Sequence, residues 1–243
     1  MGEHTIREVL KRRSSATQRE LQKRREQVIR GRRTRAPLLV LLVIILAIAG
    51  TAVYSGMLVN KVSDRFTADA IQHNAHPLDN ISLQSATAFL PNTLLAVTDP
   101  GFYDASATTI SPVTRRLVRT YFPDASAVAM WVMATAVQFR FSRTDILEAY
   151  INDVRVGQAG DKPVAGVVAA SQVYFSKPFA QLQPQEVALL VAMMINPQQN
   201  DPRRFPDKAL VSRNEVLQAD AEQTVLSQEQ ANVLSKMPLG ITP

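Results

Sequence analysis

The longest apolar run of the chain is "PLLVLLVIILAIAGTAVYSGMLV", residues 37–59, and no charged residue interrupts it. At about 1.5 Å per helical residue it is long enough to cross a hydrocarbon core of roughly 30 Å. The stretch "AIA" at 47–49 resembles a signal-peptide cleavage site, but the preceding segment of 36 residues is long for a signal peptide. The pattern therefore favours an uncleaved transmembrane anchor at 37–59, followed by a polar linker at 60–80.

Helical periodicity dominates from residue 81 onward. "AVAMWVMATAVQFRF" is a long apolar run between Pro123 and Ser142, and "VAGVVAASQVYF" is typical of a small-residue helix that packs closely. In "SRTDILEAYIND", Ser142 and Asp145 have the spacing of a capping box. The same stretch places four large residues on one helix face: Ile146, Leu147, Tyr150 and Ile151.

The last third of the chain predicts three more helices. "PQEVALLVAMMINP" has Pro184 at a first-turn position and stops before Pro197, and because it is apolar nearly all round we expect it to be central and buried. Its nine-residue stretch at 187–195 is too short for a second membrane span. "PDKALVSRNEVLQADAEQ" and "SQEQANVLSKM" follow, the latter opened by Ser227 with Gln230 in capping-box spacing. No run of alternating strands is visible, so we predict a mainly α domain over residues 81–243.

Charge is concentrated in the first 36 residues, which hold twelve Lys and Arg and four Glu. The rest of the chain holds fifteen Lys and Arg and seventeen acidic residues. The positive-inside rule then predicts a cytoplasmic tail at 1–36 and places residues 60–243 on the other side of the membrane. The tail suits anionic lipid headgroups, and since it lacks interleaved aromatic residues we expect no nucleic-acid partner.

Candidate chemistry is sparse. The chain has no cysteine, no Gly-rich phosphate loop and no Ser-x-x-Lys. His73 and His76 have no third metal ligand nearby, so no metal site is predicted. The hydroxyl cluster "SATTIS" at 106–111 and the basic "RRLVR" at 115–119 have groups that donate to phosphate, but a helix start with a solvated basic face is favoured.

Two stretches of the chain resemble glycosyltransferase family 51, the peptidoglycan glycosyltransferases. They are "FSRTDILEAYINDVRVG" and "VAGVVAASQVYFSKPFAQLQPQEVALLVAMMINPQQNDPRRFPDKALVSRNEVL". This resemblance covers about residues 137–220. It implies a bacterial inner-membrane protein with a lysozyme-like α-helical transglycosylase-type domain outside the membrane, acting on lipid II. The matching positions are Asn152, Gly157, Gly166, Ala170, Tyr174, Phe175, Lys177, Leu182, Glu186, Ala188, Leu190, Pro197, Pro202, Arg213, Val216 and Leu217.

The family's first motif, Glu-Asp-x-x-Phe-x-x-His, resembles "TDPGFYDA". Asp99 and Phe102 match, but Thr98 stands where the family has its presumed general base and Ala105 stands where it has His. The second motif, Gly-Gly-Ser-Thr-Ile-Thr-x-Gln, resembles "SATTISPV", which follows almost directly here although tens of residues separate the two motifs in the family.

The third motif, Arg-Lys-x-x-Glu, falls on "SAVAM" when the sequence is counted back without gaps from Ser142. Ser126, Ala127 and Met130 then occupy the Arg, Lys and Glu positions. Both expected catalytic Glu positions are thus replaced, by Thr98 and Met130, and Asp99 is the retained acidic candidate.

The resemblance and these replacements together predict an inactive member that acts by binding in cell-wall synthesis or envelope assembly, with no cofactor. The partners expected are membrane lipids, lipid II or peptidoglycan, and other envelope proteins. The alternative is an active enzyme with a rearranged site, for which a divalent metal would be considered. A substrate-binding role is assigned by resemblance and by residue chemistry to Phe102, Thr108, Thr109, Arg115, Arg116 and Arg119.

Overall fold

A computed structural model describes residue 20 and residues 40–68, 80–83, 88–104 and 109–242 of the chain. The chain divides into two units, 1–54 and 55–243. In the first unit, the described residues from Val40 belong to a helix that continues to Ala68 and is 29 residues long. Its most apolar window has a mean hydropathy of 2.3 and none of that window is buried. It is the one described helix long and apolar enough to span a membrane, as predicted for 37–59, although 37–39 lie outside the described residues.

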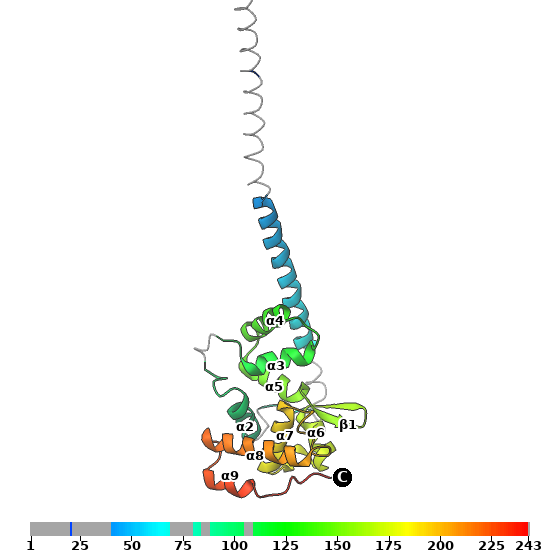
Figure 1. Ribbon diagram of the computed structural model, residues 1–243, viewed down its shortest axis with the longest axis vertical. Helices are drawn as coiled ribbons and strands as arrows, with labels where there is room; N and C mark the ends of the chain where they lie inside the picture. Colours follow the sequence, from blue (N-terminus) through cyan, green and yellow to red (C-terminus); the bar gives the residue numbers. More distant parts are fainter. Residues whose placement is uncertain (1–19, 21–39, 69–79, 84–87, 105–108, 243) are drawn as a thin grey trace, which may run out of the picture. The chain divides into compact units, whose positions relative to one another are not determined.

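The second unit is mostly helical, which confirms the predicted mainly α class. Figure 1 shows α7 among the helices α2, α6 and α8, and α7 contributes an unbroken buried stretch from Val187 to Met194. The elements are α2 (Phe89–Thr98), α3 (Pro112–Tyr121), α4 (Ala127–Arg140), α5 (Arg143–Asp153), β1 (Arg155–Ala159), β2 (Lys162–Ala165), α6 (Val167–Phe175), the short 3-10 helix η1 (Phe179–Gln181), α7 (Pro184–Ile195), α8 (Pro206–Glu222) and α9 (Gln228–Leu234).

Helix starts follow the capping signals of the sequence. At α5 the Ser142 hydroxyl accepts from the Asp145 amide at 3.1 Å, and the Asp145 carboxylate accepts in return from the Ser142 amide at 3.2 Å. At α9 Ser227 and Gln230 form the same reciprocal pair, and Pro184 is the first residue of α7 as predicted. Each pair satisfies backbone donors that a helix N-terminus leaves without partners. The predicted apolar face of α5 is fully buried.

A two-stranded antiparallel hairpin, β1 with β2, differs from the all-helical expectation for this part of the chain. The predicted helix "VAGVVAASQVYF" loses its first residues to β2, and α6 begins only at Val167. Gly166 sets this start because it has a φ of +75° and lies against the Asn152 carbonyl, where a side chain would not fit. In β1, Gly157 lies directly under the Tyr174 hydroxyl, which leaves no room for a Cβ atom.

The segment predicted as a linker, 60–80, begins as helix rather than loop. The long helix runs to Ala68, and its residues Val62 and Phe66 are buried in the core of the second unit. The Phe66 ring stacks on Phe141 with ring centroids 4.0 Å apart. Four-residue spacing puts Val62 and Phe66 on one helix face, so this turn of helix belongs to the folded domain.

Candidate functional site

The stretch "TDPGFYD" lies at the C-terminal end of α2, where Asp99 is the residue that caps the helix. The Phe102 amide donates to the Asp99 carbonyl at 2.9 Å, and the Asp104 amide donates to the Gly101 carbonyl at 2.9 Å. Two successive turns therefore reverse the chain directly after the helix, with Pro100 and Gly101 exposed at the first of them.

The Thr98 hydroxyl is used within its own helix. It donates to the Leu94 carbonyl at 2.6 Å, and the side chain is half-buried. A general base needs a lone pair that accepts a proton near neutral pH, which a hydroxyl does not offer without a base of its own. At this position the side chain completes a helix end, and it brings no carboxylate to the site.

The Asp99 carboxylate is bound to the second motif. The Ser111 hydroxyl donates to Asp99 Oδ2 at 2.5 Å and also accepts from the Thr114 amide at 3.2 Å, so that it caps α3. The Ser111 amide donates to Gln138 Oε1 at 2.8 Å, and Gln138 Nε2 donates to the Thr109 carbonyl at 3.2 Å. This network ties the end of α2, the start of α3 and the last turn of α4 together.

The aromatic residue of the first motif is part of the core. Phe102 is almost fully buried, lies edge-on against Tyr103 and has the Arg143 guanidinium 5.3 Å from its ring centre. Thr109 is exposed beside the start of α3. Thr108 and Ala105 lie outside the described residues, so their assignments stay predictions.

The third motif is at the start of α4. Ser126 caps the helix by accepting from the Ala129 amide at 3.2 Å, and Ala127 is its exposed first residue. Met130 is 6% exposed and packs in the hydrophobic core. The side chain at the expected Glu position thus points into apolar surroundings, which is the environment that least favours a charged carboxylate.

The three arginines of α3 separate into two groups. Arg115 and Arg119 are exposed, and their four-residue spacing puts them on one helix face. Arg116 donates instead to the Ile195 carbonyl at the end of α7, at 3.2 Å. Burial raises the pKa of the Tyr150 hydroxyl, and the nearby Arg116 guanidinium lowers it by a smaller amount. The predicted three-arginine set therefore leaves two residues for an external anion.

Two buried charged residues of α8 were not predicted as site residues. Arg213 was named only as a position that matches the family, and Asp220 was not singled out. Asp220 in α8 accepts from the Thr93 hydroxyl at 2.9 Å, and burial raises its pKa to about 6 while that hydrogen bond opposes the rise. Arg213 in α8 donates to the carbonyls of Ser235, Met237 and Pro238. Both lie in the packing between helices, and a polar residue on a buried helix face was the available sequence signal.

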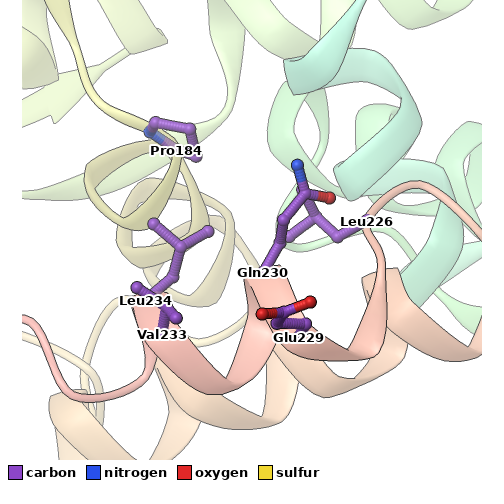
Figure 2. A pocket seen from close by; sticks show the side chains of 6 residues that line it. All are labelled: Pro184, Leu226, Glu229, Gln230, Val233 and Leu234. Atoms are coloured by element: carbon purple, nitrogen blue, oxygen red, sulfur yellow. The ribbon is translucent and has the colours of Figure 1, made fainter.

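The described residues contain no group of three or more His, Cys, Asp or Glu side chains that would hold a metal ion. A pocket of about 360 Å³ lies between the start of α7 and α9. Figure 2 shows the side chains that line it, which are Pro184, Leu226, Glu229, Gln230, Val233 and Leu234. None of the predicted site residues lines it. A smaller cavity of about 20 Å³ lies beside β1 and includes Arg155, Asp201 and Arg204.

Comparisons with known proteins support the resemblance. Residues 111–221 match the family model described as Transglycosylase. Penicillin-binding protein 1B of Escherichia coli is 33% identical over 180 residues, which cover 63% of this chain and 21% of that protein. Penicillin-binding protein 1B of Haemophilus influenzae is 36% identical over 110 residues, covering 45% of this chain and 14% of that protein.

Among solved structures, penicillin-binding protein 1A from Haemophilus influenzae aligns with a TM-score of 0.45 and 20% identity, covering 67% of this chain and 18% of that chain. The aligned part of this chain thus corresponds to about a fifth or less of each of these relatives. Residues 111–221 of this chain form a domain of the transglycosylase family, homologous to the corresponding parts of penicillin-binding proteins 1A and 1B.

Proposed function

We propose that this protein is a membrane-anchored relative of the peptidoglycan glycosyltransferases that lacks glycosyl transfer and acts by binding in the cell envelope. The anchor would be the apolar part of the helix Val40–Ala68, up to Val59, with the basic tail in the cytoplasm and the helical domain outside the bacterial inner membrane. The proposal extends the family assignment of residues 111–221 to a role for the whole chain.

The observation that carries the proposal is the environment of Met130. Glycosyl transfer from a lipid-linked diphosphate requires a base for the acceptor hydroxyl and groups that stabilise charge on the leaving diphosphate. At the two expected Glu positions this chain has a hydroxyl bonded to its own helix and a thioether packed in the core. Neither the Thr98 nor the Met130 side chain supplies an oxyanion ligand for a divalent metal, so no metal-assisted step is derived.

The alternative is an active enzyme that uses Asp99 as its base. Against this stands the contact with Ser111, because one oxygen of the carboxylate already accepts a hydroxyl hydrogen bond at 2.5 Å. The role of Asp99 that best fits these contacts is to hold the start of α3 against the end of α2.

Polymerisation of lipid II by the full chain in nanodiscs tests the proposal, with penicillin-binding protein 1B of Escherichia coli as the active reference. We expect no glycan product from the wild type. The matched carboxylate variants are Asp99→Asn and Asp124→Asn, the latter at an exposed position in the turn between α3 and α4. Product from the wild type that is lost in Asp99→Asn and kept in Asp124→Asn would replace our proposal with the active-enzyme alternative.

A binding role is tested separately with the exposed arginines of α3. Arg115 and Arg119 present two guanidinium groups on one face, and guanidinium pairs with phosphate oxygens in a bidentate manner. If the domain binds lipid II or a glycan carrying diphosphate, we expect Arg115→Glu with Arg119→Glu to weaken the binding of fluorescent lipid II to the full chain in detergent micelles, measured by fluorescence anisotropy. Lys162→Glu, at an exposed position of β2, is the control for a general loss of positive charge. Equal weakening by both would show that no arginine site exists.

A further inference from the structure

Helix α4 is mostly apolar, yet one of its faces is exposed. No charged residue lies between Asp124 and Arg140. One face packs in the core through Met130, Met133 and Val137. A helix that is hydrophobic all round is normally surrounded by apolar material on every side, so the outer face of α4 needs an explanation.

The outer face is a continuous row, which we call the α4 ridge and define as Val128, Trp131, Thr135 and Phe139. These positions are three or four residues apart and therefore lie on one helix face. Val128 is 68% exposed, Trp131 is 63% exposed and Phe139 is 83% exposed. At about 200 Å² per aromatic side chain, the two rings alone expose roughly 300 Å². That is as large as the biggest apolar patch on many soluble monomers, a size that usually marks an interaction site.

The polar member of the ridge is compatible with an apolar surrounding. The Thr135 hydroxyl donates to the Trp131 carbonyl within the helix at 2.8 Å. Its donor is therefore satisfied without water, which is the condition for placing a hydroxyl in lipid. Trp131 also suits a membrane surface, because tryptophan is enriched at the interface between membrane and water.

The C-terminal end of the ridge lies beside the long helix that carries the apolar span. Directly after Phe139, the Arg140 guanidinium donates to the Ser63 hydroxyl at 2.9 Å, and Phe141 stacks on Phe66. Ser63 is only four residues beyond the end of the apolar run at Val59, which corresponds to about 6 Å along the helix. That distance lies within the headgroup layer, which extends roughly 5–8 Å beyond the hydrocarbon core on each side.

We infer that the α4 ridge lies in the outer interface of the lipid bilayer that the long helix spans, as a second membrane contact of the domain. This inference rests on the proposed membrane anchor. Its occupant is lipid because the ridge is continuous, through the contacts of Arg140 and Phe141, with the residues that follow the apolar span. The contact would hold the domain at a fixed height and orientation on the membrane surface.

The chain carries its own probe for the test, since Trp131 is the single tryptophan of the sequence. The full chain is reconstituted in lipid vesicles whose phospholipids carry bromine on the acyl chain, either near the headgroup or near the chain end. We expect the Trp131 emission to lie at short wavelength and to be quenched, more strongly by bromine near the headgroup. Emission typical of a water-exposed tryptophan, unquenched by both lipids, would overturn the inference.

Matched variants separate the ridge from unspecific effects. Phe139→Glu places a charge on the ridge, and Val211→Glu places one at an apolar position of α8 that is 57% exposed. We expect Phe139→Glu to shift the Trp131 emission to longer wavelength and to reduce quenching, and Val211→Glu to leave both unchanged. Equal responses of both variants would count against a ridge contact. Circular dichroism checks that both variants keep their helices.

The anchor is tested independently by flotation with vesicles and by resistance to alkaline extraction. A chain that floats and resists extraction but has an unquenched Trp131 would refute the ridge while leaving the anchor intact. A chain that is extracted at high pH would refute the anchor instead. Quenching that is present for the chain alone but absent when another membrane protein is bound would show that the ridge contacts lipid and that the bound protein competes with lipid for the ridge.

Discussion

The substitution Met130→Glu introduces the residue type that the family resemblance predicts at this position, and its effect follows from the burial of the side chain. Met130 is 6% exposed in the core under α4. Losing a buried methionine side chain costs about 2–3 kcal/mol of folding free energy. Each unit by which burial raises the pKa of the introduced carboxyl costs about 1.4 kcal/mol at neutral pH, and a rise of about two units adds roughly 3 kcal/mol.

One effect acts in the opposite direction. Position 130 is the fourth residue of α4, and the helix dipole stabilises an acid in the first turn by about 0.3–1 kcal/mol. Burial therefore outweighs the dipole, and we expect Met130→Glu to destabilise the domain by about 5 kcal/mol. For a unit of this size that lowers the melting temperature by roughly 10–20 °C. Because the pKa of the carboxyl is raised in the folded state, the loss should shrink as the pH falls from 7 to 5.

Thermal unfolding of the full chain in detergent micelles, followed by circular dichroism at 222 nm, measures this effect. Ala127→Glu is the control, because the same residue type enters an exposed position in the first turn of the same helix. We expect the control to change stability by less than about 0.5 kcal/mol. Equal melting temperatures for the two variants would refute the reasoning, since a carboxyl at position 130 would then reach water as a catalytic group must.

Three further predictions concern the buried polar groups and the hairpin. Asp220 has a pKa raised to about 6, so its charge should lower stability by about 3 kcal/mol as the pH rises from about 3 to 7, and Asp220→Asn should flatten the pH dependence of the melting temperature. Arg213→Met leaves three carbonyls without their donor, so we expect a loss of about 2–4 kcal/mol and faster proteolysis of the segment after Leu234. Gly157→Ala places a Cβ on the Tyr174 hydroxyl, and we expect a loss of about 2–3 kcal/mol that Tyr174→Phe partly restores in the double variant. A melting temperature that the double variant does not raise above that of Gly157→Ala would contradict the steric explanation.

Local signals in the sequence were sufficient for most helices. Prolines and capping residues have effects within one turn, and the starts of α5, α7 and α9 follow from Ser142, Pro184 and Ser227. The buried face of α5 followed from the 3.6-residue period. These features depend on neighbours along the chain, which is why the sequence alone predicts them.

Features that depend on distant contacts were missed. The hairpin of β1 and β2 has no alternating pattern, and its end is set by Gly166 packing on the Asn152 carbonyl. The helical turn at Val62 and Phe66 was hidden among the charged residues 61, 64 and 65. Likewise, the uniformly apolar sequence of α4 did not reveal which face is buried, so the enclosure of Met130 could be found only from the tertiary structure.

The contacts of the predicted site residues could be predicted from the sequence only in part. The pairing of Asp99 with Ser111 joins two motifs that the sequence analysis had treated separately, and side-chain contacts across a loop carry no periodic signal. The substrate-binding roles of Thr109, Arg115 and Arg119 stay predictions. Phe102 and Arg116 are engaged in the core and at the end of α7, which a one-dimensional motif match does not disclose.

The most direct test of the central claim is the release of the diphosphate leaving group from lipid II by the full chain in nanodiscs, measured beside penicillin-binding protein 1B of Escherichia coli at equal concentration. We expect release no faster than in protein-free nanodiscs, because the two expected Glu positions hold Thr98 and the buried Met130. Release at a rate comparable to that of the reference protein would contradict it.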